Sequence, residues 1–288
     1  MRCESAAVHP GAATLPPVAS SPEVPNSDLD LALGLADVAD SITLARFRAQ
    51  DLQVDAKPDN TPVTDADTAT EAAIREQLAA ARPEDPVFGE EFGGALPGSG
   101  RVWVIDPIDA TKNFLRGITV YATLIGLIDD GVPTVGVVSA PAMGRRWWAA
   151  AGRGAWTQDA SGADPRRCRV SGVSDLADAS FSYSDHVGWE EQGMLAGFDE
   201  LRDRVWRSRA YGDFYSHVLV AEGAVDIAAE PELSPWDMAA FLPIVAEAGG
   251  TVTSVTGSSP LGGASAVSTN GLLHESTLAV LAGRDTAA

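Results

Sequence analysis

Apolar residues along the chain recur at two spacings, one typical of helices and the other of strands. Residues 28–50 carry leucines and other apolar side chains at helical spacing, which predicts an amphipathic helix. A second helix is expected to begin near Asp67, because Thr68 and Glu71 have capping-box spacing. Further helices are expected over residues 213–222, from Asp237 onwards with a kink or an early end at Pro243, and from about Glu275.

Short apolar runs bounded by turn residues predict the strands. Residues 102–105 read as a buried strand, and Asp130-Gly131 is a hairpin signal between strands over 120–128 and 134–139. A second hairpin is expected across Gly152-Arg153. Shorter strands are expected over 180–184, 205–209, 225–229 and 251–255. This alternation of helices and strands, without internal repeats, predicts a layered α/β or α+β architecture.

Composition is ordinary for a globular protein, with 45% hydrophobic and 21% charged residues. The net charge of −20 opposes nonspecific binding to nucleic acid or to an anionic membrane, so neither partner is expected. Cys3 and Cys168 are the only cysteines, which fits a reducing compartment. No apolar run approaches the roughly 20 residues of a membrane span. The cytoplasm is therefore the expected location.

Three segments are expected along the chain. Residues 1–27 are rich in Ala, Pro and Ser, which predicts a disordered N-terminal tail. Between Asp159 and Arg167 the sequence consists of small and polar residues, which favours a boundary between two subdomains there. The first, an α+β subdomain over 28–165, carries most of the candidate metal ligands described below. The second, an α/β subdomain over 166–284, carries Asp237 and the substrate-side candidates.

The stretch from Trp103 to Phe114 is the strongest candidate for chemistry. Its buried strand delivers Asp106 and Asp109, and Pro107 biases the residue before it toward an extended backbone. Residues typical of a helix start follow, where free N–H groups attract anions. Two carboxylates beside an anion-attracting helix end would repel phosphate unless cations lay between them. The stretch therefore predicts a metal-dependent phosphate site.

Acidic residues at three further places extend this hypothesis. Asp67 and Asp237 stand at expected helix starts, and Glu90-Glu91 lies in a loop punctuated by glycines. Any one of them alone is explained by a helix cap or a solvated turn, so only their conjunction indicates a functional site. Carboxylate oxygens suit hard cations, and the four histidines show no metal-ligand spacing. Magnesium, or manganese in its place, is the expected metal.

Three motifs in this order resemble the inositol monophosphatase superfamily over about residues 28–284: Gly89-Glu90-Glu91, Asp106 through Phe114, and Trp236-Asp237 followed by Glu247-Ala248-Gly249-Gly250. Arg209 through Phe214, and the Lys112 after Thr111, are most similar to the actinobacterial type of histidinol-phosphatases within that superfamily. The resemblance implies an αβαβα sandwich of the inositol monophosphatase and fructose-1,6-bisphosphatase type. It also implies lithium-sensitive, magnesium-dependent hydrolysis of a phosphomonoester, with histidinol phosphate as the substrate.

The resemblance further implies how metal ions are held. Glu90, Asp106 and the backbone carbonyl of Ile108 would bind the first ion. Asp106, Asp109 and Asp237 would bind the second, and Glu90 with water would bind a weaker third. Two such cations clamp the attacking and leaving oxygens of an in-line displacement. Hydrolysis by metal-activated water, without a covalent phosphoenzyme, is the implied reaction.

Catalytic and phosphate-binding roles follow from the same resemblance. Thr111 and Asp67 match the pair that orients and deprotonates the attacking water, with Glu91 and Lys57 as supporting groups. The backbone N–H groups of Ala110 and Thr111 would hold the phosphate oxygens. Ala110 stands where the family usually has glycine. We expect a negative φ at this position, as is normal for a helix start, and activity that survives the added methyl group.

The expected substrate carries an ammonium group and an imidazole, so its pocket should supply carboxylates. Asp213 and Glu230 match the family's substrate-side positions, and Asp213 is the more telling because inositol phosphatases have small uncharged residues there. A helix cap is the plain alternative for Asp213. Arg209 is expected to brace these acids or to line the pocket, and Lys112 to lie on the substrate side. The resemblance also implies a homodimer.

Other functions compete with this one. The same fold could act on inositol phosphate or on a 3′-phosphoadenosine nucleotide. Asp65-Ala66-Asp67 resembles the motif of aspartyl-phosphate phosphatases of the haloacid dehalogenase type, but Ala69 stands where that motif needs Thr or Val, so we reject it. A non-catalytic regulator that binds metal or phosphate is favoured only by Ala110. The retention of Thr111 and Asp67 speaks against it.

Overall fold

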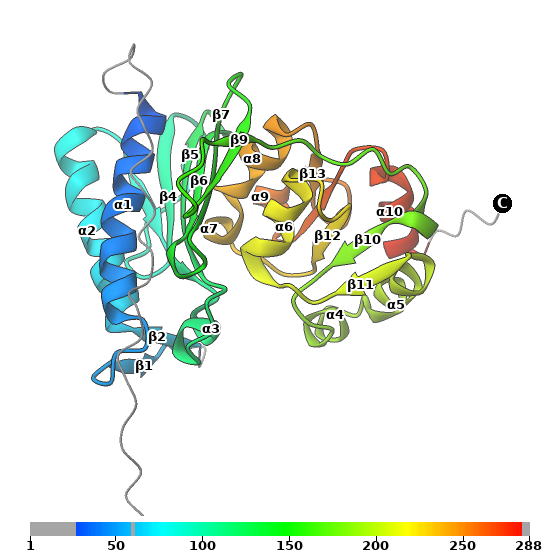
Figure 1. Ribbon diagram of the computed structural model, residues 1–288, viewed down its shortest axis with the longest axis horizontal. Helices are drawn as coiled ribbons and strands as arrows, with labels where there is room; N and C mark the ends of the chain where they lie inside the picture. Colours follow the sequence, from blue (N-terminus) through cyan, green and yellow to red (C-terminus); the bar gives the residue numbers. More distant parts are fainter. Residues whose placement is uncertain (1–26, 59–60, 284–288) are drawn as a thin grey trace, which may run out of the picture.

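The computed structural model describes residues 27–58 and 61–283, which form five layers in the order α, β, α, β, α (Figure 1). Helices α1 (Asp28–Arg46) and α2 (Asp65–Ala81) cover the outer face of a seven-stranded sheet. Helices α6 (Asp213–Ala221), α7 (Pro235–Met238) and α8 (Phe241–Glu247) lie between that sheet and a five-stranded one. Helices α5 (Leu195–Arg204) and α10 (His274–Leu281) cover the far face. The predicted αβαβα sandwich is confirmed.

The seven-stranded sheet has the order β3-β4-β5-β6-β7-β8-β9. Its first pair is parallel and the others are antiparallel. Both predicted hairpins are confirmed, with turns at Asp130-Gly131 and Gly152-Arg153. The strands are β3 (Val87–Gly89), β4 (Arg101–Asp109), β5 (Ala122–Asp129), β6 (Val132–Ala140), β7 (Arg145–Ala150), β8 (Ala155–Asp159) and β9 (Arg166–Arg167).

The five-stranded sheet has the order β11-β10-β12-β14-β13. Strand β10 is parallel to β11 and β12, whereas β14 is antiparallel to both of its neighbours. The strands are β10 (Ser180–Ser182), β11 (Arg207–Arg209), β12 (Ile227–Glu230), β13 (Thr251–Thr253) and β14 (Ala266–Thr269). Strand β14 was not predicted, because its four residues are half polar although all are buried.

Short elements complete the described chain. A small antiparallel pair, β1 (Val54–Ala56) and β2 (Pro62–Thr64), lies before α2. The remaining helices are α3 (Thr111–Leu115), α4 (Val187–Glu191), α9 (Pro260–Gly263) and the 3-10 turns η1 (Pro141–Met143) and η2 (Leu176–Asp178). The tail predicted over 1–27 lies outside the described residues except for Ser27, whose hydroxyl accepts the Asp30 N–H and caps α1.

Two helix starts differ from the prediction. The capping box of α2 is formed by Thr64 and Asp67, not by Thr68 and Glu71, and the helix therefore begins at Asp65. Thr64 is the better cap because its backbone is extended and its hydroxyl accepts the N–H groups of the first turn. The helix expected from Asp237 onwards is two short helices. Pro243 falls in the first turn of α8, where no N–H is needed.

The middle helical layer packs against the seven-stranded sheet with the two backbones in close contact. A Cβ atom at Gly136 would lie 1.9 Å from the carbonyl oxygen of Ala240, and one at Gly126 would lie 2.7 Å from the Cβ of Ala239. Glycine is therefore required on β5 and β6 beneath the α7–α8 junction. The contact brings Asp237, on α7, to the sheet that carries Asp106. No described helix has the length and hydrophobicity needed to cross a bilayer.

Candidate active site

The carboxylates of Asp106 and Asp109 face the same site because the end of β4 is irregular. Residues three apart on a regular strand point to opposite faces of the sheet. The pairing of β4 with β5 shifts register between these two residues, which re-aims the second side chain. The N–H of Ile108 donates to Asp106 Oδ1 at 2.9 Å, and the hydroxyl of Thr123 donates to the Pro107 carbonyl at 2.8 Å. These bonds hold the irregular turn in shape.

Asp237 completes a three-carboxylate cluster. One oxygen from each of Asp106, Asp109 and Asp237 lies within 4.8 Å of the other two. Asp237 belongs to a capping box, in which its Oδ2 accepts the N–H of Ser234 at 2.7 Å. Asp237 therefore both caps α7 and belongs to the cluster.

The loop that follows β3 brings a second acidic pair to the site. Lys57 Nζ lies 2.7 Å from Glu90 Oε1 and 2.8 Å from Glu91 Oε1. The buried carboxylate of Glu71 accepts the N–H groups of Glu91 at 2.7 Å and Phe92 at 3.2 Å, which fixes the loop on α2. Glu71 was missed as a positioning residue because its spacing from Thr68 suggested a cap. Its position one helical turn after Asp67 was the available signal.

Asp67 lies behind Thr111. It is fully buried, and its Oδ2 accepts both the N–H and the hydroxyl of Thr64. The other oxygen, Oδ1, accepts the Thr111 hydroxyl at 3.4 Å, while that hydroxyl also lies 3.0 Å from the Ile108 carbonyl. A capping role thus uses one oxygen of Asp67 and leaves the second directed at Thr111.

Ala110 differs from the prediction. Its φ is +65° and its ψ is +47°, so it adopts the left-handed conformation rather than the negative φ expected at a helix start. The reason is local: Ala110 is the residue before α3, where the chain turns sharply out of the irregular end of β4. This conformation costs alanine about 1 kcal/mol or more relative to glycine. The predicted negative φ is therefore wrong and gives no support to phosphate binding at Ala110.

The substrate-side candidates lie on the five-stranded sheet and on α6. Asp213 begins α6, and its backbone N–H donates to the Ser184 hydroxyl at 2.8 Å. Ser184 in turn donates to Glu230 Oε1 at 2.8 Å, with Glu230 buried at the end of β12. The next N–H of the chain, from Phe214, donates to Asp109 Oδ2 at 2.9 Å. The start of α6 therefore contacts the carboxylate cluster directly.

Arg209 is not brought to these acids. Its side chain is exposed, and its guanidinium donates to the carbonyl of Ser208 at 2.7 Å. Among the described residues it forms no ion pair with Asp213 or Glu230. Lys112 does reach the substrate side, since its charge acts to lower the pKa of Asp213 against the larger effect of burial, which raises that pKa.

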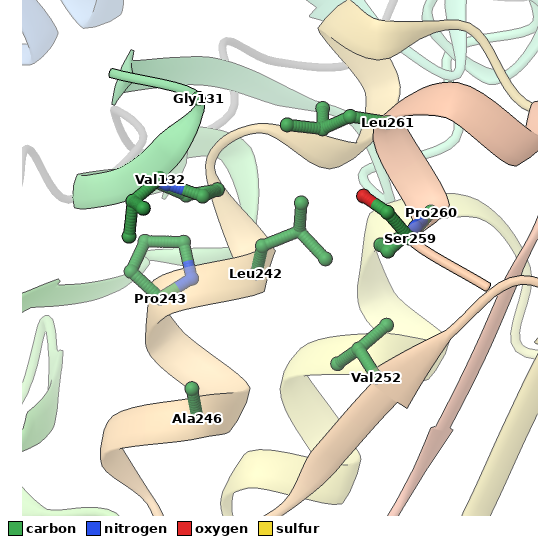
Figure 2. Close-up of a pocket in the computed structure, with 10 residues that line it drawn as sticks. Gly131, Val132, Leu242, Pro243, Ala246, Val252, Ser259, Pro260 and Leu261 are labelled. Atoms are coloured by element: carbon green, nitrogen blue, oxygen red, sulfur yellow. The ribbon is translucent and has the colours of Figure 1, made fainter. Parts of the chain in front are cut away.

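A cavity of about 660 Å³ joins these groups. Its lining combines residues near the carboxylate cluster with residues of the substrate side. They are Lys57, Thr61, Pro62, Glu90, Ala110, Thr111, Lys112, Asn113, Ser184, Asp185, Ala210, Tyr211, Gly212, Asp213, Ser234, Trp236 and Asp237. A second cavity, of about 250 Å³, lies between the β5–β6 turn and helix α8, with Leu242, Val252 and Leu261 among its walls (Figure 2). Its lining holds no charged side chain, so a phosphate ester suits the first cavity better than this one.

Burial, and after it repulsion between neighbouring carboxylates, raises the pKa values of the acids in this site. Burial, reinforced by neighbouring carboxylates, raises the pKa of Asp106 and of Asp109 well above the usual range. Burial and the nearby charge of Glu90 raise the pKa of Asp237 to about 7. Burial also raises the pKa of Asp67 to about 6, that of Glu91 to about 7 and that of Glu230 to about 8.

This donor set fits a hard divalent cation. The ion pairs of Lys57 go to Glu90 and Glu91, which leaves the Asp106, Asp109 and Asp237 carboxylates without a salt-bridge partner in the part of the chain described here. Three carboxylates that repel one another, with Asp106 buried and the other two half-buried, are stable as anions only beside positive charge. The site supplies oxygen donors alone, which is the chemistry of magnesium and manganese sites.

No histidine of the described residues belongs to this arrangement, and His9 lies outside them. His217 is packed in the core: its ring stacks on Phe241 with centroids 4.0 Å apart, and Nδ1 lies 2.8 Å from the hydroxyl of Ser268. Burial lowers the pKa of His217 to about 3, so the ring is neutral at physiological pH.

The layered fold is shared with solved structures of other proteins. The extragenic suppressor protein suhB of Bartonella henselae superposes with a TM-score of 0.79 at 29% identity, covering 88% of this chain and 97% of that one. The inositol monophosphatase of Zymomonas mobilis gives a TM-score of 0.77 at 31% identity, over 88% and 97% of the two chains.

Sequence comparison places the chain in one family. The profile of the inositol monophosphatase family matches residues 26–285, and the chain belongs to that family. It is 58% identical to the histidinol-phosphatase of Mycobacterium tuberculosis over 253 residues, which are 88% of this chain and 97% of the relative. The resemblance read from the motifs is confirmed.

Proposed function

We propose that this protein is a magnesium-dependent histidinol-phosphatase, which hydrolyses histidinol phosphate to histidinol and phosphate in histidine biosynthesis. The observation that carries the reaction type is the convergence of Asp106, Asp109 and Asp237 on one point beside a 660 Å³ cavity. The substrate is supported by the 58% identity to a curated histidinol-phosphatase and by the carboxylate of Asp213, which lines the cavity, with the buried Glu230 linked to it through Ser184.

Two or three magnesium ions are the proposed cofactors, with manganese as a substitute. Asp106, Asp109, Asp237, Glu90 and the Ile108 carbonyl would hold them. When bound, such cations neutralise a phosphate and lower the pKa of water. This assignment also explains why a chain with a net charge of −20 can bind an anionic ester, since the ions reverse the local sign of the charge.

The chain's own residues have separate tasks in the proposed hydrolysis. The Thr111 hydroxyl, held between Ile108 O and Asp67 Oδ1, orients the attacking water. Asp67, with its pKa raised to about 6, accepts the proton that water loses. Lys57 and Glu91 stabilise the loop that carries Glu90. The N–H groups of Ala110 and Thr111 are proposed to bind the phosphate oxygens.

The far end of the cavity would bind the rest of the ester. Asp213 is the proposed partner of the substrate's ammonium or imidazole, with Glu230 behind it and Lys112 beside it. Arg209 is not part of this proposal, because its guanidinium lies on the surface strand.

A homodimer in the cytoplasm is the proposed state. Strand β11 is an edge of its sheet, and Trp206 beside it is 67% exposed, which suits a surface that another subunit covers. The buried, unpaired Cys168 fits a reducing compartment. Light scattering coupled to size exclusion tests the dimer, which a Trp206→Glu variant should weaken.

A panel of phosphate esters tests the function. Phosphate release is measured from histidinol phosphate, inositol 1-phosphate and a 3′-phosphoadenosine nucleotide, each with magnesium and with EDTA. We expect kcat/KM for histidinol phosphate to exceed the others by at least about 100-fold and to vanish in EDTA. Higher kcat/KM for another ester would reject the substrate, and phosphate binding without release would leave only the regulator hypothesis.

A further inference from the structure

The turn that leads into α6 is held by side chains rather than by an N-terminal cap. Residue Gly212, the position before the helix, has no side chain to cap it. Three consecutive backbone N–H groups instead donate to three side-chain oxygens: Gly212 to Ser216 Oγ at 3.1 Å, Asp213 to Ser184 Oγ at 2.8 Å and Phe214 to Asp109 Oδ2 at 2.9 Å.

This turn is strained where it carries Asp213. The φ of Gly212 is +84° and that of Asp213 is +49°, which is uncommon for any residue other than glycine. Such a conformation persists only where the surroundings hold it, and it occurs most often at functional sites. In the described chain, the carboxylate of Asp213 has no hydrogen-bond donor, although it lines the large cavity. The strain therefore presents a free carboxylate to the cavity.

Ser184 is the link between this turn and the second substrate-side acid. It follows β10, and Glu230 ends the parallel neighbour β12, so both lie at the carboxyl edge of the sheet. The Ser184 hydroxyl accepts the Asp213 N–H and donates to Glu230 Oε1, both at 2.8 Å. The Ser184 hydroxyl therefore links two acidic residues from separate elements: it accepts a bond from the backbone of Asp213 on α6 and donates one to the side chain of Glu230 on β12.

We propose that Ser184 is a positioning residue for substrate selection: by joining the Asp213 backbone to the buried Glu230, it holds the Asp213 carboxylate in the cavity, where it receives the cationic part of the ester. This inference rests on the proposed function. Ser184 has no contact with the Asp106, Asp109 and Asp237 cluster among the described hydrogen bonds. Its removal should therefore weaken recognition of the cationic group and leave phosphate binding and the chemical step intact.

The Ser184→Ala variant tests this directly. We expect KM for histidinol phosphate and the inhibition constant of histidinol to rise about tenfold, with kcat within about twofold of the wild type. The inhibition constant of inorganic phosphate and the turnover of p-nitrophenyl phosphate, which has no cationic group, should stay unchanged. Ser184→Thr keeps the hydroxyl and should restore the wild-type KM. Ser41→Ala, an exposed serine on α1, is the matched control.

Each outcome decides the inference. An equal loss on both esters, or a raised inhibition constant for phosphate, would show that Ser184 only supports the fold. An unchanged KM for histidinol phosphate in Ser184→Ala would reject the positioning role while leaving the proposed function in place. If the wild-type protein does not hydrolyse histidinol phosphate at all, the proposed function fails and this inference fails with it.

Discussion

Removing divalent cations should make the protein less stable at pH 8 than its magnesium-bound form, by a margin that grows with pH. The physical basis is the pKa of Asp237, which is about 7 in the folded, metal-free site against an ordinary value of 3.8. A carboxyl whose pKa is raised on folding stabilises the native state while it keeps its proton. That contribution is lost as the pH rises through the folded pKa.

The magnitude follows from this single group. At pH 6 the retained proton on Asp237 stabilises the native state by about 1.4 kcal/mol, and at pH 8 by about 0.1 kcal/mol. Asp106 and Asp109 change in the same direction, because their pKa values are also raised. A bound cation replaces the proton. The stabilisation by magnesium should therefore increase by at least about 1 kcal/mol between pH 6 and pH 8.

Urea denaturation at both pH values, with EDTA or with excess magnesium, measures this difference. Groups outside the cluster, such as Glu230, titrate in both series and cancel when the two unfolding free energies are subtracted. The control is Asp237→Asn, which removes one titrating carboxyl and should reduce the increase. A magnesium effect that is equal at pH 6 and pH 8, or smaller at pH 8, would refute the reasoning.

Three further predictions concern single residues. Ala110→Gly removes a methyl group at the predicted phosphate position, so the inhibition constant of phosphate should fall by less than about tenfold; a fall of several orders of magnitude would show that the natural site is crippled. Gly89→Ala would place a Cβ 2.0 Å from Glu71 Oε1, so kcat should fall by at least about 100-fold, and an unchanged kcat would contradict the role of that contact. With magnesium present, the neutral His217 should cost the native state about 2 kcal/mol between pH 7 and pH 5, because only the unfolded chain binds the proton. His217→Gln should flatten that part of the urea-measured pH profile, and an unchanged slope would reject the assignment.

The fold was predictable where local signals agreed with the tertiary structure. The Asp130-Gly131 turn and the flanking apolar runs specify one hairpin, and the three motifs specify the layer order by resemblance. Strand β14 escaped prediction because its burial comes from its neighbours in the sheet, not from a hydrophobic pattern of its own.

The motifs singled out residues that the structure brings together, but not their geometry, and they also singled out Arg209, which lies apart. The convergence of Asp106, Asp109 and Asp237 agrees with the motifs. The left-handed backbone of Ala110 was mispredicted because alanine rarely adopts it, although the glycine usual at this position in the family was a signal for it. Ser184 carries no sequence signal: its importance comes from bonds to Asp213 and Glu230, which lie 29 and 46 residues away.

The most direct test of the central claim is a magnesium titration of histidinol phosphate hydrolysis by the wild type and by Asp237→Asn. The account predicts no phosphate release without a divalent cation and saturable activation of the wild type. The variant, which keeps the size of the side chain but loses its charge, should need far more magnesium and lose at least about 100-fold in kcat/KM. Full activity of either protein in EDTA, or wild-type kinetics in Asp237→Asn, would contradict the claim that these acids act by holding metal ions.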